Sequence, residues 1–553
     1  MTRIRSRSIV GALAVGLSLA ACGGSSPSSS TTGSATSTTD PASAVPASAV
    51  LYAQAVVRPS GPLAAGINAG AKKLIGIANP GAMIDAAIDS AIKTPHVSYQ
   101  ATIRPWLGQR AGIALLGGSA AKPQFALVAD QTNAALARKA LFGLVRSAAT
   151  NSAAGAVVSG SYRGVSYLAK RDGSAAVAVA GPFAIVGTLS AVRQVIDVEQ
   201  GAAALSAAPD YQAATAHTIS SAAVTAFIRT RQLLTLLLSS GNATAGASAL
   251  LDKLIPANFA VLASARLDAS GLTVDIATPA TGLGGGTGPS TLFAALPGGS
   301  WLALAESGVG AALAKALTLL ADVSSGVASS GGAILRKCST SSTGKATCTT
   351  TTMTATTTTS TVTESPATAA ILSAYTKVLR QISDLALFVK GTALADIEGG
   401  LEIAMTSPGA ATSLFGELKG LLGGLSSTQV RIGSLTAAGI DRGFTATVPG
   451  VPFVFDVAQK GNMLLGTFGN GALADALSTT NRLGDSATGS LLGAGVRPVL
   501  ALSLPAVAKL LKSLGVTSNA TVAQIVPYLN SLGTVAVGQS ASGGYVVERI
   551  AIG

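Results

Sequence analysis

Tyr162-Arg163-Gly164-Val165 opens a stretch that runs to Val186-Gly187-Thr188, and Asp441-Arg442-Gly443-Phe444 opens a second that runs to Leu465-Gly466-Thr467. Both stretches start with an Arg-Gly pair, continue through apolar runs of strand length, and end with a Gly-Thr pair. A helical pattern follows each of them. The two stretches therefore predict the same succession of hairpin strands and helix at two places in the chain.

Other parts of the chain repeat in the same order. Leu296-Pro297 and the apolar residues from Trp301 echo Val45-Pro46 and the strand expected after it, and Ile397–Ala404 echoes Leu107–Ala114. The members of each pair lie about 250 to 279 residues apart. Repetition in a fixed order predicts an internal duplication.

Each copy has the pattern of an α+β domain. Short apolar runs separated by Gly, Pro and Ser predict strands, and apolar residues three and four apart predict helices. In the first copy the strands are expected at 50–57, 111–116, 124–129, 155–160, 164–170, 175–188, 224–228, 258–267 and 271–277. The helices between them are expected at 63–79, 82–93, 133–147, 189–200, from 210, and at 230–239. We expect two similar domains, each a mainly antiparallel sheet with helices packed on one face.

Composition divides the chain of 553 residues into consecutive segments. They are a signal segment at 1–21, a Ser/Thr-rich flexible tether at 22–44, a first repeat at 45–280, a Gly-rich linker at 281–290, and a second repeat at 291–553 with a Thr-rich insertion at 336–366. The second repeat is expected to close with strand 498–504, helix 505–514 and strands 534–539 and 545–550. A chain of this length is too long for one core.

The first residues have the pattern of a secretory signal. Arg3, Arg5 and Arg7 precede an apolar run that ends in Leu19-Ala20-Ala21-Cys22. This ending resembles the bacterial lipobox, so we expect Cys22 to be lipidated and to anchor the chain to the extracytoplasmic face of the cell membrane. The alternatives are an ordinary signal peptide and an uncleaved anchor, but the run is shorter than the roughly 20 residues that span a bilayer.

The charge balance is basic, with 37 Lys and Arg against 24 Asp and Glu. A net charge of +13 is compatible with nucleic acid or with an anionic surface. The basic residues are scattered along the chain, and an exported protein does not meet nucleic acid. We therefore expect no nucleic-acid partner and a charge suited to an anionic envelope.

Three cysteines are present, and Cys22 is assigned to the lipid. Cys338 and Cys348 remain, and an oxidising compartment favours a disulfide between them. Zinc is the alternative, but no Cys-x-x-Cys is present and both histidines, His96 and His217, are distant in sequence. We expect a structural disulfide that closes a solvent-exposed loop, whose Ser/Thr content also suits O-glycosylation.

No familiar catalytic pattern occurs. The two histidines are expected to be surface or packed residues, and no Gly-x-Ser-x-Gly, Ser-x-x-Lys or His-Glu-x-x-His is present. Asp396, Glu398 and Glu402 form the densest carboxylate cluster, and Asp396 and Glu398 would share one face of a strand. A divalent cation there is conceivable, but an exposed strand start is the expected structure. We predict no catalytic residue, no metal and no cofactor.

Two further patterns have structural interpretations. Trp106 in Pro105-Trp106-Leu107-Gly108 precedes a strand and is expected to plug the end of a core rather than to stack on a ligand. Arg163 and Arg442 precede glycines in both copies, which indicates a turn requirement in each copy rather than a single active site.

The lipobox, the segment 45–53, the Pro-Trp-Leu-Gly motif and the Arg-Gly and Gly-Thr blocks resemble an actinobacterial family of exported proteins built on a domain of unknown function. The resemblance covers about residues 45–553. It implies an envelope protein with no assigned activity, and it supplies no catalytic residue.

The preferred hypothesis is a lipid-anchored, non-enzymatic envelope protein that binds an apolar or lipid-like ligand in or between its two domains. Two domains leave a cleft between them, and Ala, Val and Leu would line it. A scaffolding role, binding another envelope protein or the cell wall, is the first alternative. An enzyme with an unrecognised site is the second.

Overall fold

The computed structural model describes most of the chain from Thr39 onward. The described residues are 39–92, 98–119, 122–150, 157–238, 255–280, 288–315, 317, 334–340, 346–352, 373, 375–425, 429–485 and 491–553. The signal segment, Cys22, His96 and residues 281–287 of the expected linker lie outside these ranges. No helix within them has the length and hydrophobicity that crossing a bilayer requires.

Strands account for most of the regular structure. Those before residue 280 are β1 Leu51–Val56, β2 Leu107–Ser119, β3 Lys122–Gln131, β4 Val157–Tyr162, β5 Val165–Lys170, β6 Ala176–Ala180, β7 Phe183–Gly187, β8 Val224–Arg229, β9 Ala260–Asp268 and β10 Gly271–Pro279. The later ones are β11 Gly288–Pro289, β12 Leu302–Ser307, β13 Ile334–Thr340, β14 Ala346–Thr352, β15 Ile382–Lys390, β16 Glu398–Met405, β17 Arg431–Ser434, β18 Arg442–Thr447, β19 Val454–Lys460, β20 Met463–Phe468, β21 Arg497–Ser503, β22 Thr534–Ser542 and β23 Tyr545–Ile552. The strand patterns of the first copy are confirmed.

Helices connect these strands. In the first half they are η1 Pro41–Ser43, α2 Gly61–Ile75, α3 Pro80–Ile92, η2 Tyr99–Ile103, α4 Ala134–Thr150, α5 Leu189–Glu199, η3 Leu205–Ala207, α6 Pro209–Thr215 and α7 Thr230–Leu238. In the second half they are α9 Leu292–Ala295, α12 Pro408–Gly423, α13 Ala472–Leu477, η4 Leu483–Asp485, α15 Leu504–Ser513, η5 Val516–Ser518 and α16 Ala520–Ser531. The expected α+β content is therefore observed.

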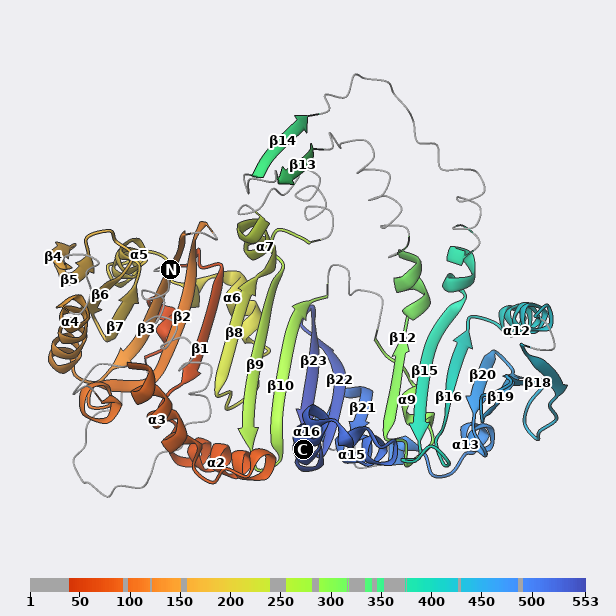
Figure 1. The fold of residues 1–553 in the computed structure, drawn as a ribbon. Helices are drawn as coiled ribbons and strands as arrows, with labels where there is room; N and C mark the ends of the chain where they lie inside the picture. Colours follow the sequence, from red (N-terminus) through yellow and green to blue (C-terminus); the bar gives the residue numbers. More distant parts are fainter. Residues whose placement is uncertain are drawn as a thin grey trace.

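One antiparallel sheet of 21 strands runs through both halves (Figure 1). The first half pairs in the order β4-β5-β6-β7-β3-β2-β1-β8-β9-β10. The second half pairs in the order β17-β18-β19-β20-β16-β15-β12-β21-β22-β23, and the short β11 adds to β12. The chain thus visits the strands of each half in the same order.

The two halves meet by direct strand pairing. β10 pairs with β23 from Leu272 opposite Ile552 to Pro279 opposite Tyr545. Backbone hydrogen bonds therefore join the halves along this seam. The last strand of each half pairs with the last strand of the other, so the two halves share one sheet instead of forming two separate ones.

Helices cover both faces of the sheet at its outer ends, so the expectation of one covered face is wrong. Val128 of β3 packs in one cluster with Val192 of α5. Its neighbour Leu127 packs in a second cluster with Leu141 of α4. Successive strand residues point to opposite faces, so α4 and α5 lie on opposite sides of the same strands. In the second half, Leu464 packs with α12 and Leu465 packs with α13.

Two expected boundaries need correction. The tether was expected to reach Ala44, but η1 is capped by the side chain of Asp40, and Ala42, Ala44 and Val45 are buried in the first core. Residues 40–44 therefore belong to the folded first half and not to the tether. The Thr-rich insertion at 336–366 was expected to be a loop, but in its described part β13 and β14 pair as antiparallel strands. Residues 341–345 and 353–366 lie outside the described residues. The β-branched threonines of these segments favour extended backbone.

Two sequence echoes are also out of register. β16 pairs with β15 and β20 as β3 pairs with β2 and β7, so Ile397–Ala404 occupies the place of β3 and not that of Leu107–Ala114. Gly187 lies six residues after the turn glycine Gly181, whereas Gly466 lies five after Gly461. A one-residue offset exchanges the two faces of a strand, so the Gly-Thr pairs do not match in space.

Candidate functional site

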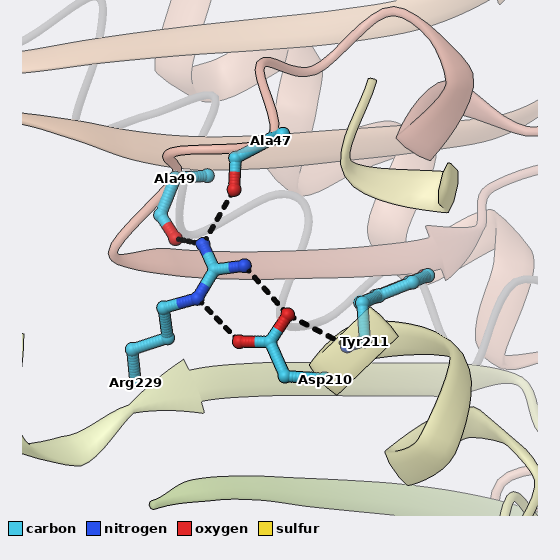
Figure 2. Close-up of polar contacts among 5 residues, drawn as sticks. All are labelled: Ala47, Ala49, Asp210, Tyr211 and Arg229. Atoms are coloured by element: carbon cyan, nitrogen blue, oxygen red, sulfur yellow. Dashed lines mark hydrogen bonds and ion pairs between the residues drawn. The ribbon is translucent and has the colours of Figure 1, made fainter. Parts of the chain in front are cut away.

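Arg229, the last residue of β8, is buried and makes hydrogen bonds to Asp210, Ala47 and Ala49 (Figure 2). We call this group of residues the arginine latch. Arg229 donates from Nε to Oδ2 of Asp210 at 2.6 Å and from Nη2 to Oδ1 at 2.8 Å. Its Nη1 donates to the carbonyl oxygens of Ala47 at 2.7 Å and Ala49 at 2.5 Å. Asp210, in the first turn of α6, also accepts from the backbone N–H of Tyr211. The latch therefore ties the start of β1, the end of β8 and α6 together.

The contacts of the latch leave little capacity for a ligand. Arg229 is 9% exposed, and four of its five N–H groups are used. Burial raises the pKa of Asp210, but the hydrogen bonds and charge of Arg229 outweigh burial and hold that pKa below its ordinary value. The pair therefore stays ionised at neutral pH and has a structural role.

A second ion pair, with a buried carboxylate and a partly exposed arginine, crosses the seam between the halves. Arg549 of β23 donates from Nε to Oδ1 of Asp275 at 2.7 Å and from Nη2 to Oδ2 at 2.6 Å. The two residues are directly opposite each other in the β10–β23 ladder. Nη1 of Arg549 donates to the carbonyl oxygen of Leu492 at 2.8 Å. Asp275 is 3% exposed, so this ion pair is part of the core of the seam.

Glu402 is a carboxylate buried inside the sheet of the second half. It lies in the middle of β16, between Ala386 of β15 and Leu465 of β20, and it is 4% exposed. Its Oε1 is buried without a hydrogen-bond partner. Burial raises the pKa of Glu402 to about 7, although the charges of Arg482 and Lys460 act to lower it. At neutral pH this carboxyl is therefore partly protonated.

The first half has valine at the corresponding place. The backbone N–H of Gln131 donates to Pro182 at 2.9 Å, and that of Met405 donates to Asn462 at 2.9 Å, which aligns β3 with β16. Val128 lies three residues before Gln131, and Glu402 lies three residues before Met405, so the two residues occupy equivalent places in the two halves. Val128 is fully buried in the first core. The fold therefore accepts an apolar side chain at this place, and the carboxyl of Glu402 is a separate feature of the second half.

The three carboxylates that are clustered in the sequence do not come together in the structure. Asp396 lies in the turn before β16, where its Oδ1 accepts from the backbone N–H groups of Thr392 and Ala393. Glu398 pairs with Lys390, which also contacts Asp475 of α13. Glu402 lies four residues further along the strand. Among the described residues, no three His, Cys, Asp or Glu side chains are placed to hold a metal ion.

Trp106 has the structural role that its sequence context indicated. It is buried in the second core, and its Nε1 donates to the carbonyl oxygen of Thr102 at 2.7 Å. His217 is half-buried, and its ring lies 4.6 Å from the ring of Tyr545 across the seam. His217 is therefore packed against the second half.

The Arg-Gly pairs differ between the halves. Arg163 and Gly164 form the tight turn between β4 and β5, with φ of +44° and +80°. Arg442 and Gly443 instead lie within β18, and the turn before that strand has its positive φ at Gly439. The turn requirement therefore holds for Arg163-Gly164 and is wrong for Arg442-Gly443.

The cysteine expectations are tested only in part of the chain. Cys22 lies outside the described residues. Cys338 and Cys348 are register partners in the β13–β14 ladder, directly opposite each other. The disulfide itself stays a prediction.

Sequence reasoning missed the two ion pairs and the burial of Glu402. The sequences of β10 and β16 indicate that these two carboxylates are buried. Asp275 lies between Val274 and Ile276, and Glu402 lies between Leu401 and Ile403. A single charge inside an apolar run indicates a strand with both faces covered. Its partner, however, lies in a distant part of the chain.

Comparison with known proteins gives one match. No curated protein and no solved structure matches the chain significantly. A family model described as "Protein of unknown function (DUF3352)" matches residues 9–324, which include the whole first half and the start of the second. The match covers more than half of the 553 residues. The chain belongs to the DUF3352 family of proteins of unknown function.

Proposed function

We propose that this chain is a lipid-anchored, non-enzymatic scaffold on the extracytoplasmic face of a cell membrane. The observation that carries the proposal is the continuous sheet, in which β10 and β23 join the halves by direct pairing. Strand pairing and the Arg549–Asp275 ion pair join the two halves. Such a junction suits a rigid platform better than two domains that open and close around a ligand. Scaffolding therefore replaces the binding of an apolar ligand between domains as the preferred role.

We also propose that the two halves arose by duplication. Their strands pair in the same order, and the matched backbone hydrogen bonds of Gln131 and Met405 support a common template. A duplicated platform offers two related surfaces at the ends of one sheet (Figure 1). Such a platform can hold two partners, or two sites on one partner, at a fixed separation.

A disulfide between Cys338 and Cys348 is part of the same proposal. The two residues are opposite each other in the β13–β14 ladder, although the structure does not place the described cysteines at disulfide distance. An exported chain meets an oxidising environment. The bridge would stabilise a hairpin whose threonines offer little apolar surface.

Replacing Cys22 with serine is expected to release the chain from the membrane. Serine cannot carry the thioether-linked lipid, so metabolic labelling with palmitate should be lost and the chain should leave the membrane fraction. The matched control is Cys338→Ser, which should stay labelled and membrane-bound. Equal labelling of the Cys22→Ser variant would contradict the anchor.

The scaffolding role is tested by cross-linking in intact cells. A lysine-reactive reagent should join the anchored chain to a recurring envelope protein, and the released Cys22→Ser variant should capture it less. No partner above the level of that variant would contradict scaffolding. An acyl lipid co-purified in native mass spectrometry, in the absence of such a partner, would instead favour the ligand-binding role.

A further inference from the structure

Four helical elements line one edge of the sheet. Helices α2, α16 and α15 lie along this edge, at the lower ends of the strands in Figure 1. The short η5 lies between α15 and α16 in the sequence. Ser531 at the end of α16 donates to the carbonyl oxygen of Leu74 near the end of α2, at 3.3 Å. The edge therefore joins the first half to the second. We call these four elements the basic edge.

Large apolar side chains are exposed along the basic edge. All are between 40% and 62% exposed, and they are Ile75, Leu514, Val516, Ile525 and Tyr528. Ile525 and Tyr528 are three residues apart on α16, so they lie on the same face of that helix. Single exposed apolar residues are normal, but several on adjoining elements indicate an interaction surface.

The charges of the basic edge all have one sign. Lys72 and Lys73 of α2 and Lys509 and Lys512 of α15 are exposed, and the four elements contain no Asp or Glu. Within the described part of the chain, none of these lysines forms an ion pair with a carboxylate. Positive charge beside exposed apolar side chains is the combination that binds an anionic lipid surface.

The helix dipole explains part of this pattern. Lys72, Lys73 and Lys512 lie in the last turns of their helices, where positive charge is favourable in any protein. The dipole does not explain why exposed apolar side chains accompany them. Helix α12 provides a contrast, because its exposed Leu421 shares the helix with Glu417 as well as Lys419. The basic edge combines several exposed apolar side chains with positive charge on helices that adjoin one another.

We propose that the basic edge docks on the anionic headgroups of a membrane, with Ile525 and Tyr528 entering the interface. The inference rests on the proposed anchor, because a lipidated Cys22 would keep the edge close to a bilayer. Sixteen residues lie between Cys22 and Thr39, and a fully extended segment of this length spans at most about 60 Å. The anchor confines the chain to the surface, and the edge fixes its orientation there.

Vesicle binding by the unlipidated full-length mature chain, carrying Cys22→Ser, tests the surface without the anchor. Vesicles of phosphatidylglycerol and phosphatidylcholine in equal parts should bind the chain, and binding should weaken at high salt. Replacing Lys72, Lys73, Lys509 and Lys512 with glutamine should lower the partition coefficient about 100-fold, since each lysine near an anionic surface contributes several-fold. Ile525→Ser with Tyr528→Ser should lower it about tenfold.

The control is Lys419→Gln with Leu421→Ser on α12, which should bind vesicles as the parent does. All these positions are exposed, so circular dichroism should be unchanged in every variant. Equal binding by parent and edge variants, or no binding by the parent, would overturn the proposal. A parent dimer that Ile525→Ser with Tyr528→Ser dissociates would assign the edge to a second copy instead. Palmitate labelling of Cys22 is measured separately, so failure of the edge and failure of the anchor are distinguishable.

Discussion

Replacing Arg549 with methionine is expected to destabilise the protein by about 3 kcal/mol. The substitution removes both hydrogen bonds to Asp275, whose side chain is 4% exposed in the centre of the seam. A carboxylate buried without its cation retains the cost of desolvation and loses the compensation. Urea denaturation followed by circular dichroism at pH 7 should show a lower midpoint of unfolding.

A double substitution separates the buried charge from the seam itself. Asp275→Leu combined with Arg549→Met removes both charges, so it should recover most of the stability that the single variant loses. Arg266→Met is the matched control, because Arg266 pairs with Asp268 on β9 and both side chains are about one third exposed. It should cost less than about 1 kcal/mol. A double variant as unstable as Arg549→Met would show that the seam does not depend on charge pairing.

The strands and helices were predictable because their signals are local. Alternation of apolar residues identified β8 and β9, and apolar spacing of three and four identified α5. The pairing of β10 with β23 was not predictable in this way. It joins residues about 270 apart, and nothing within either strand specifies which edge it will bind. The sequence led us to expect two domains with a cleft between them. A free strand edge is unfavourable, and in the structure the last strand of each half covers the free edge of the other.

The environments of Asp275 and Glu402 were likewise not predictable from their own strands. The positions of Asp275 and Glu402 within apolar runs indicate burial, but their state depends on residues elsewhere. Arg549 lies opposite Asp275 and keeps it paired. Glu402 has only Ala386 and Leu465 opposite, so burial dominates its pKa. The prediction that Asp396 and Glu398 share one face of a strand was wrong for a local reason. The strand begins at Glu398, and Asp396 lies in the turn before it.

Glu402 is expected to make the protein less stable as the pH rises. The carboxyl titrates near 4.5 in an ordinary environment and at about 7 in the fold. Between these values the folded chain holds a proton that the unfolded chain has released, so the free energy of unfolding falls as the pH increases through this window and is level above it. The difference amounts to about 3 kcal/mol at pH 8. Glutamine at position 402 carries no charge, so Glu402→Gln should be about that much more stable than the parent at pH 8 and similar to it at pH 4.5.

Glu398→Gln is the control for this prediction, because Glu398 lies on the same face of β16 but pairs with Lys390. It should change stability by less than about 1 kcal/mol and leave the fall in stability between pH 4.5 and 7 in place. Glu402→Val, which copies Val128 of the first half, should remove that fall as Glu402→Gln does. If the parent and Glu402→Gln show the same dependence on pH, then Glu402 is ionised in the fold and a partner must reach its Oε1. If the dependence is present in the parent and absent from Glu402→Gln and Glu402→Val, the second half holds a protonated carboxyl where the first half has valine. The protein then loses stability toward alkaline pH because this carboxyl ionises.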